Sequence, residues 1–287
     1  MRGILCWVNQ LAVLLASLSS YIAPAPINYG DFSDIPPGSV MYLDVTESAS
    51  FPDDKEPLFG PPSITADTLN FDPLDEFSAG VGNSDNSGGR LSFILTSNES
   101  AITNFVVTST GRYTLSGEGS SATNVGYFSS ISELNIMEVD GIPVASPVVL
   151  PGTEISQTYD LSSGEADDAI WTNSHTLDIN AALQNAGVVF QYGATKLGIV
   201  FENIMTSASE KSSDSMIELT AISLSPTTTF AFIPGDVNGD GVVNLLDVAP
   251  FVELLTSGRF LPAADVNGDG IVDLLDVQPF VDLLTGA

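Results

Sequence analysis

The sequence predicts a mainly β protein, in which a β-sandwich of jelly-roll type is followed by a small all-α domain. Three observations predict this fold class. Short runs rich in β-branched and aromatic residues recur between clusters of Gly, Asn, Ser and Pro across residues 27–225. No long helical pattern interrupts these runs, and residues 179–184 would form one turn. Residues 236–287 instead contain a duplicated acidic segment, and each copy is followed by apolar residues at helical spacing.

The N-terminal residues 1–25 are predicted to be an export signal. Arg2 supplies the positive charge, and residues 4–18 are apolar but too short to span a membrane. An uncleaved anchor is the alternative. Cys6 is the single cysteine and lies within this signal, so the mature chain would have neither a disulfide nor a thiolate metal site. We therefore expect a secreted or cell-surface protein with no transmembrane span after signal cleavage.

The charge balance limits the partners of the chain. Seven Lys and Arg residues stand against 36 Asp and Glu residues, which gives a formal net charge of −29. Nucleic acids and anionic membranes are bound through basic patches, so we expect neither as a partner. Hydrophobic residues make up 44% of the chain, which is enough to build a real core.

Residues 26–225 are predicted to form the sandwich. The expected strands are residues 40–45, 91–96, 105–110, 113–116, 131–139, 188–192, 197–204 and 217–224. The expected loops, which are polar or rich in Gly and Pro, are residues 53–62, 71–89 and 206–215. Residues 226–234 would then be a linker to a C-terminal domain of residues 235–287.

The duplicated segment reads D-V-N-G-D-G-V-V-N-L-L-D at residues 236–247 and D-V-N-G-D-G-I-V-D-L-L-D at residues 265–276. Calcium takes six to eight oxygen ligands, and a 12-residue loop supplies them from positions 1, 3, 5, 7, 9 and 12, with glycine at position 6 for the turn. Position 7 contributes its main-chain carbonyl. We predict two Ca²⁺ ions. The ligands would be Asp236, Asn238, Asp240, Val242, Asn244 and Asp247 in the first loop, and Asp265, Asn267, Asp269, Ile271, Asp273 and Asp276 in the second.

Each loop is predicted to lead into one helix. Asp247 and Asp276 would cap these helices, and the proline three residues later would fall in the first turn, where it costs no hydrogen bond. The apolar residues expected on one face are Val248, Phe251, Val252 and Leu255, and Val277, Phe280, Val281 and Leu284. Pro and Gly residues before each loop leave no room for an entering helix.

Two calcium loops that each have only an exiting helix resemble the type I dockerin domain. The resemblance covers residues 236–287 and implies docking to a cohesin-like protein or a cell-surface scaffold. The sequence departs from the family at loop positions 10 and 11, where leucine pairs replace the expected polar pair. These pairs are Leu245-Leu246 and Leu274-Leu275. The calcium-dependent fold is therefore implied by the resemblance, whereas the familiar cohesin specificity is not.

The two loops are not expected to bind calcium equally. The first contains three carboxylates and the second contains four, and ligand charge raises calcium affinity, so we predict that the second loop binds more tightly. Arg259 is the only basic residue of the tail. Its carboxylates would repel one another without metal, so we also predict that the tail folds only when it binds calcium.

The sandwich region offers no decisive catalytic motif. Hydrolysis of a glycosidic bond needs two carboxylic acids across a cleft, and no pattern selects a pair among Asp140, Glu165, Asp167, Asp168 and Glu202. Residues 165–168 would be an acidic sugar-binding loop, a further calcium site or a solvated turn. His175 is the only histidine, which is typical of a structural residue. The aromatic residues Trp171, Tyr127, Phe128 and Tyr192 would either stack on sugar rings or lie in the core.

Two functional hypotheses follow. The first is an exported, non-catalytic binding module whose calcium-dependent, dockerin-like tail docks to a cohesin-like partner, with a role in polysaccharide binding or breakdown. The alternative is a polysaccharide-degrading enzyme of the glycoside hydrolase type that carries a dockerin. The absence of a catalytic signature favours the first. In a third possibility, the tail closes the C-terminus as a calcium-stabilised cap without any partner.

Overall fold

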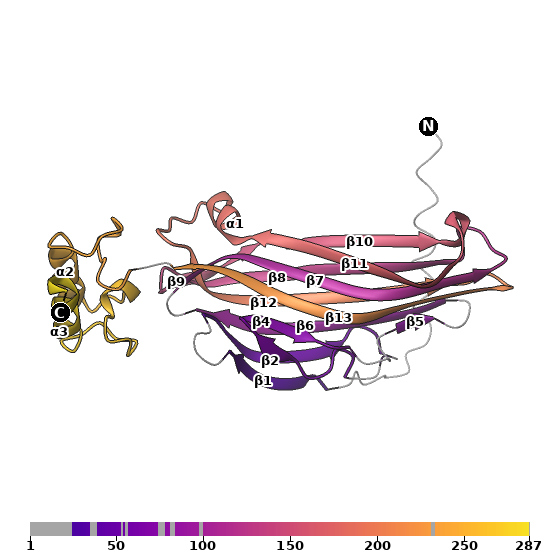
Figure 1. The fold of residues 1–287 in the computed structure, drawn as a ribbon, viewed down its shortest axis with the longest axis horizontal. Coiled ribbons are helices and arrows are strands. Elements are labelled where there is room, and N and C mark those ends of the chain that lie inside the picture. The colour runs from indigo at the N-terminus through magenta and orange to yellow at the C-terminus, as the bar shows by residue number, and fades with distance from the viewer. Residues whose placement is uncertain are drawn as a thin grey trace.

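The structure is a computed structural model that describes residues 25–34, 39–52, 54, 57–73, 78–80, 84–97, 100–230 and 233–286. Most of the predicted export signal lies outside these residues. Figure 1 shows an elongated β domain with a small helical unit at one end. Within the described ranges, no helix is both long and apolar enough to cross a membrane.

Within the described residues, the β domain contains thirteen strands that pair antiparallel throughout. They are β1 (Ile27–Ser33), β2 (Met41–Ala49), β3 (Ser63–Thr65), β4 (Thr68–Phe71), β5 (Ser78–Gly80), β6 (Ser84–Thr96), β7 (Ser100–Gly117), β8 (Asn124–Val139), β9 (Ile142–Leu150), β10 (Thr153–Asp160), β11 (Ala166–Asp178), β12 (Ala194–Ala208) and β13 (Ser213–Phe230). The helices are the 3-10 turns η1 (Leu161–Ser163) and η2 (Pro262–Ala264) and the α-helices α1 (Ile179–Asn185), α2 (Val248–Ser257) and α3 (Val277–Thr285).

The strands form two layers. One layer runs β1-β2-β6-β12-β8, and both β9 and β10 pair with the far side of β8. The other layer places β7 between β11 and β13, and both β4 and β5 pair with β13. In the described chain, the layers are joined through the single pair Ala194–Ile102. The predicted β-sandwich is therefore confirmed.

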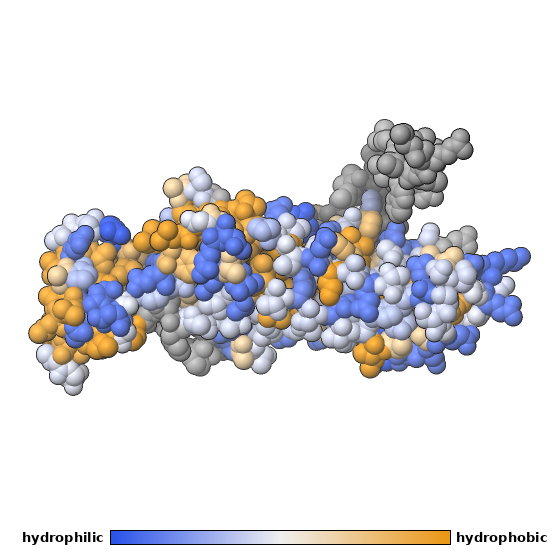
Figure 2. Space-filling view, turned by 90° about the horizontal axis from the view of Figure 1, so that it is seen from above, coloured by the Kyte–Doolittle hydropathy of each residue, from blue (hydrophilic) through white to orange (hydrophobic). Residues whose placement is uncertain are grey.

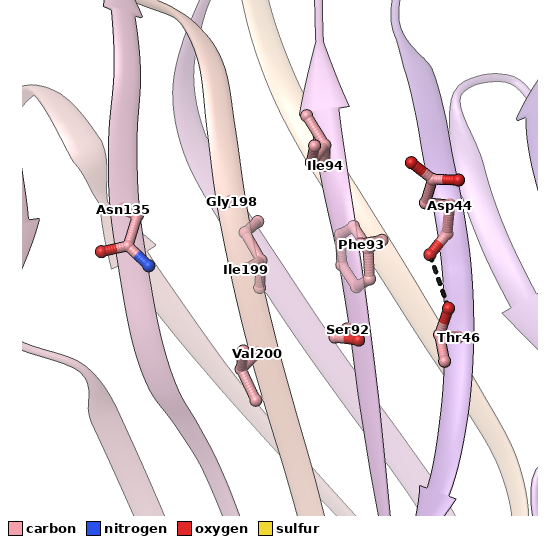
Figure 3. A pocket seen from close by; sticks show the side chains of 9 residues that line it. All are labelled: Asp44, Thr46, Ser92, Phe93, Ile94, Asn135, Gly198, Ile199 and Val200. Carbon is pink, nitrogen blue, oxygen red and sulfur yellow. Dashed lines mark hydrogen bonds between the residues drawn. The ribbon is translucent and has the colours of Figure 1, made fainter. Parts of the chain in front are cut away.

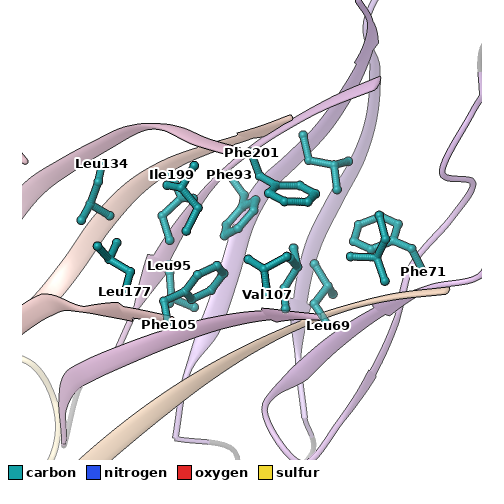
Figure 4. Close-up of a cluster of buried hydrophobic side chains, with 14 of the residues drawn as sticks. Leu69, Phe71, Phe93, Leu95, Phe105, Val107, Leu134, Leu177, Ile199 and Phe201 are labelled. Atoms are coloured by element: carbon teal, nitrogen blue, oxygen red, sulfur yellow. The ribbon is translucent and has the colours of Figure 1, made fainter. Parts of the chain in front are cut away.

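The core lies between the two layers. Alternate residues of β12, including Ile199 and Phe201, are buried, as expected for a strand with one face toward the core. The side chains of Phe93 and Phe105 meet from opposite layers with ring centroids 6.1 Å apart, and Figure 4 shows them among aliphatic residues of both layers. Burying each such side chain stabilises the fold by about 1.5–3 kcal/mol.

Part of the loop predicted at residues 71–89 is strand. β6 begins at Ser84, and its glycine-rich part pairs with β12 from Ala208 to Glu202. Gly89 is required by packing, because a β-carbon there would lie 2.4 Å from the ring of Phe59. The polar and glycine-rich composition that indicated a loop therefore belongs to a strand whose partner and neighbouring ring determine its conformation.

The strand predicted at residues 188–192 is absent. This segment follows α1 as irregular chain, and Val188 and Phe190 pack against the core without a strand partner. The carboxylate of Asp140 holds the end of the segment by accepting hydrogen bonds from the main-chain N–H groups of Gln191, Tyr192 and residue 193, at 2.7, 2.7 and 2.9 Å. The segment is thus shaped by a contact with a carboxylate about 50 residues away in the sequence, which no local pattern signals.

The predicted linker is shorter than expected. β13 continues through Pro226 to Phe230 and pairs there with the beginning of β7. The polar loop expected at residues 206–215 is shorter as well, because β12 and β13 extend to Ala208 and from Ser213. The predicted turn at residues 179–184 is α1, so that expectation is confirmed.

The C-terminal unit consists of two helices that follow two loops. Phe251 of α2 and Phe280 of α3 stack with ring centroids 4.1 Å apart and an interplanar angle of 10°. Gly258 and Gly286 end the helices in the left-handed conformation, which glycine adopts without strain. The expected apolar face was partly wrong: the buried residues of α2 are Phe251 and Leu254, whereas Val252 is 50% exposed.

Candidate metal centres and docking surface

The first residue of each acidic loop organises the turn that follows it. The carboxylate of Asp236 accepts hydrogen bonds from the N–H groups of Gly239, Asp240 and Gly241 at 2.9, 3.1 and 2.8 Å. Asp265 accepts the corresponding three bonds in the second loop at 2.9, 3.1 and 2.8 Å. The two copies therefore share one backbone conformation, which their sequence repeat predicts.

The last residue of each loop closes it. Asp247 accepts hydrogen bonds from the N–H groups of Asn238 and Asn244, and Asp276 accepts the equivalent pair in the second loop, at 2.8–3.0 Å. Both aspartates are fully buried. They occupy the helix N-cap positions, but their side chains make no capping hydrogen bond. The predicted capping is thus wrong, because these carboxylates turn back into the loops.

The remaining predicted ligands are held by the same kind of short turn. Asn238 Oδ1 accepts the N–H of Asp240, and Asp240 Oδ1 accepts the N–H of Val242, at 2.8 and 3.0 Å. Asn244 Oδ1 accepts the N–H of Leu246 at 2.8 Å. The second loop repeats all three bonds. One difference is that Asn244 Nδ2 also donates to the position-7 carbonyl of Val242, at 3.1 Å, a bond that an aspartate at position 9 cannot make.

The donor chemistry fits a hard divalent cation. Every predicted ligand offers oxygen, and the buried carboxylates of Asp247 and Asp276 form no ion pair with a basic side chain in the described parts of the chain. Burying an uncompensated carboxylate is costly, and a bound cation would supply the missing charge. Over the same residues, no three acidic, His or Cys side chains converge closely enough to hold a metal on their own. The full ligand set, with its amide and main-chain oxygens, therefore stays a prediction.

The leucine pairs beside the loops are strongly exposed. Leu245 and Leu274 are each 80% exposed, and Leu246 and Leu275 are each 67% exposed. Figure 2 shows hydrophobic side chains gathered on the small C-terminal unit. Because equivalent residues have equal exposure, the repeat presents the same apolar feature twice. We call these four leucines the leucine pairs.

Comparison with protein families identifies this unit. Residues 234–279 match the model of the dockerin type I domain. The C-terminal unit is a type I dockerin domain. The match covers both loops and the beginning of the second helix, and it supports calcium as the ion of the dockerin. No curated protein matches the chain.

Solved structures that resemble the chain are β proteins. A non-crystalline-cellulose-specific carbohydrate-binding module, CBM28, is 9% identical with a TM-score of 0.21, covering 58% of this chain and 78% of the module. The module TmCBM61, solved with β-1,4-galactotriose, is 10% identical with a TM-score of 0.18, over 67% and 85%. Lectin I-B4 from Griffonia simplicifolia is 10% identical with a TM-score of 0.19, over 71% and 100%. Likenesses this distant carry no argument about ligand or activity.

The acidic residues considered for catalysis do not share a site. Asp140 is occupied by the three N–H groups of the 191–193 segment, and Glu202 accepts a hydrogen bond from Ser50 at 2.7 Å. Asp168 forms an exposed ion pair with Arg112. Glu165 accepts the N–H of residue 117, and residue 167 is exposed. These contacts stabilise separate turns and strand ends.

The aromatic candidates for sugar stacking are largely internal. Trp171 and Tyr127 are each 2% exposed and pack together with ring centroids 4.4 Å apart, and burial raises the pKa of Tyr127 to about 12. Phe128 is half-buried. Tyr192 faces the dockerin, where burial and then the carboxylate of Asp236 raise its pKa to about 12. Trp171 and Tyr127 are therefore core residues, as one of the two sequence interpretations stated.

His175 has a structural environment. Its Nδ1 lies 2.9 Å from the Thr153 hydroxyl, and its Nε2 lies 3.2 Å from the Ser129 hydroxyl. Burial lowers the pKa of His175, which favours the neutral ring. Neither partner is acidic, so these contacts do not orient the ring as a catalytic base.

A hollow of about 280 Å³ on the outer face of the β2-β6-β12-β8 layer was missed by sequence reasoning. Its polar groups come from Asp44, Thr46, Ser92 and Asn135, as Figure 3 shows. Asp44 has a φ of 52° at a register shift between β2 and β6, and this bulge directs its carboxylate outward. The sequence contains little that would predict this hollow, because a bulge depends on how two strands pair.

Proposed function

We propose that this chain is an exported, non-catalytic binding module that attaches to a cohesin-like protein on a cell-surface scaffold through its dockerin. The observation that carries the proposal is the equal exposure of the leucine pairs beside two equivalent loops. A domain that only capped the C-terminus would gain nothing from four exposed leucines, because exposed apolar side chains favour aggregation and mark interaction sites.

The dockerin is proposed to hold two Ca²⁺ ions, one in each loop. The ligands would be the oxygens at positions 1, 3, 5, 7, 9 and 12. Support comes from the buried carboxylates of Asp247 and Asp276, which form no ion pair within the described residues, and from the matching hydrogen bonds of the two loops. The ions would neutralise carboxylates that otherwise repel one another across a small core.

The partner surface is proposed to be apolar where it meets the leucine pairs. Calorimetry against a panel of cohesin-like domains, with calcium and with EDTA, tests the docking. Replacing all four leucines in the variant L245S/L246T/L274S/L275T should weaken binding about 30-fold or more, as expected when central apolar anchors are removed. Ile170→Ser removes an exposed apolar side chain from the sandwich and is the control.

Undiminished binding of the leucine variant would refute the apolar docking surface. Binding that persists in EDTA would refute its dependence on calcium. A dockerin that binds none of the cohesin-like domains but loads calcium normally would favour the capping role instead.

The sandwich is proposed to bind a polysaccharide at the hollow beside Asp44. Support comes from convergent carboxylate, hydroxyl and amide groups on one sheet face, which are groups that bind sugar hydroxyls. Asp44→Ala and Asn135→Ala should each weaken retention on insoluble polysaccharide, whereas Asp167→Ala on the other layer should not. Unchanged retention in both variants would place any glycan site elsewhere.

Formation of a hydrolysis product distinguishes the enzyme alternative from the binding proposal. The calcium-loaded chain is incubated with a polysaccharide panel, and reducing ends are measured. Release of sugar in proportion to protein concentration would replace the binding proposal with hydrolysis. Export is tested separately, by detecting the mature chain in extracellular and cell-surface fractions.

A further inference from the structure

The sandwich contacts the first calcium loop at its fourth residue, and the fourth residue of the second loop has no such neighbour among the described residues. A β-carbon placed on Gly239, at position 4 of the first loop, would lie 1.5 Å from Gln191 Nε2. The Gln191 side chain therefore rests directly on that loop. The equivalent residue of the second loop, Gly268, has no atom within 4 Å of the same position. Two loops with nearly identical internal hydrogen bonds thus have different surroundings at position 4.

Gln191 is held in place by the sandwich. The Asp140 carboxylate accepts its main-chain N–H at 2.7 Å and that of Tyr192 at 2.7 Å. Gln191 Nε2 donates to the Tyr192 hydroxyl at 3.1 Å, which fixes the end of the side chain. The segment therefore presents a pre-organised surface to the dockerin, and little ordering entropy is lost when the two meet.

The contact extends beyond Gln191. Ala101 of β7 and Ala263 of η2 are both fully buried in one small cluster, against which Tyr192 and Leu261 pack. Residue 141 of the sandwich lies under the Pro262 ring, because a β-carbon there would be 2.6 Å from Pro262 Cγ. These contacts place the segment between the two calcium loops, residues 260–264, on the end of the sandwich, which Figure 1 shows as the end where α1 and β9 lie.

The burial of the first ligand of each loop follows this asymmetry. Asp236 is 3% exposed, whereas Asp265 at the same position of the second loop is only half-buried. Their hydrogen bonds to their own loops are the same. The difference must therefore come from the neighbouring residues of the chain and not from the loop sequence.

We infer that Gln191 and Tyr192 form a clamp for the first calcium loop, so that calcium binding at this loop and seating of the dockerin on the sandwich stabilise each other. The inference rests on the proposed calcium sites. It makes Gln191 and Tyr192 positioning residues, since they act on the loop backbone and offer no ligand. The chain would then be a rigid two-domain unit when loaded with calcium.

The physical basis is linkage. Contacts made only by the folded loop raise its affinity for the ion that folds it, and by reciprocity the ion strengthens the contacts by the same factor. The clamp and the number of carboxylates have opposite effects on which loop binds calcium more tightly. The second loop has one more carboxylate, whereas the first loop gains affinity from the sandwich in the intact chain.

The clamp leaves the docking surface free. Leu245 and Leu246 of the first copy are as exposed as Leu274 and Leu275 of the second. A partner could therefore approach either copy while the dockerin is seated. The expected role of the clamp is to set the direction in which the leucine pairs face relative to the sandwich.

The experiment uses the full chain with one loop silenced at a time. Calcium binding at the first loop is measured by calorimetry in an Asp265→Ala background, and at the second loop in an Asp236→Ala background. Gln191→Ala should weaken the first loop about five-fold or more, the usual lower range of coupling between sites, and leave the second loop unchanged. Gln184→Ala, an exposed glutamine on α1, is the matched control.

Small-angle scattering gives a second readout. The calcium-loaded full chain should give the narrow pair-distance distribution of one fixed domain arrangement. Gln191→Ala should broaden that distribution and increase the maximum dimension, because it releases the dockerin from the sandwich. The inference is overturned if Gln191→Ala leaves both the first-loop affinity and the scattering unchanged, or if it weakens both loops equally. Failure of both loops to bind calcium in the unmodified chain would instead refute the proposed calcium sites.

Discussion

The two calcium loops of the dockerin are nearly identical in sequence and in internal hydrogen bonding, yet Gln191 of the sandwich contacts Gly239 of the first loop, whereas Gly268 of the second loop has no such neighbour. Asp236 and Asp265 accept the same three N–H groups, but only Asp236 is almost completely buried. A repeat therefore determines the local loop, while the surroundings of each copy decide how that loop behaves. The difference separates two contributions to calcium affinity, namely the ligands and the packing around them.

Calcium removal has the largest expected effect, because it would unfold both loop–helix copies of the dockerin together. EDTA should unfold α2 and α3, since the dockerin core is small and its carboxylates repel one another without metal. The sandwich should retain its β structure. Far-ultraviolet circular dichroism and hydrogen exchange measure the two parts. Full protection of both helices after exhaustive chelation would contradict the prediction.

Removing either of the stacked rings has the next largest expected effect, because each copy contributes one ring to the dockerin core. Phe251→Ala and Phe280→Ala should each destabilise the dockerin by about 3–5 kcal/mol, the usual cost of removing a buried aromatic side chain. Thermal unfolding at saturating calcium measures the loss. Closely similar losses would show that the core is symmetric; a much larger loss from one ring would mean that the asymmetry extends into the core.

Comparing alanine substitutions at the two equivalent glycines measures the contribution of the contact with the sandwich. Gly239 and Gly268 have φ angles of 73° and 75°, so alanine costs about 1–2 kcal/mol of backbone strain at either site. Gly239→Ala should cost about 0.5–1.5 kcal/mol more, because it also displaces Gln191 and breaks its hydrogen bond to Tyr192. Calcium-dependent thermal stability of the full chain measures both variants. Equal effects would argue against a contact that matters for stability.

The smallest expected effect is a dependence of sandwich stability on pH, which does not involve the calcium loops. Burial lowers the pKa of His175, so the unfolded chain binds more protons than the folded chain below about pH 6.5. The sandwich should therefore lose stability as pH falls from about 6.5 through the folded pKa. His175→Gln should flatten this part of the profile, as measured by urea unfolding of the calcium-loaded chain between pH 5 and 8. An unchanged slope would mean that other groups carry it.

Local patterns predicted the parts of the molecule that depend on neighbouring residues. The 12-residue spacing led to two loops, and the structure forms them with the predicted residues turned onto their own backbone. Pro250 falls in the first turn of α2 and Gly258 ends it, since these residue types act through the backbone at their own position. The sandwich class likewise followed from many short β-rich runs.

Other predictions failed where distant residues decide. Residues 84–89 form a strand although they are polar and rich in glycine, because β12 pairs with them and the Phe59 ring fills the space above Gly89. Residues 188–190 are apolar, as a strand would be, but the Asp140 carboxylate binds the main chain of the next two residues. No local rule includes those partners.

The sequence by itself determined the two acidic loops, the helices that follow them and the β character of the larger domain. Each of these depends on residue types at short spacing. Only the tertiary structure decided that Trp171 lies in the core, that a bulge at Asp44 opens a hollow, and that Gln191 lies on the first loop. The physical reason is that burial and contact between remote segments arise from packing, which a linear pattern does not contain.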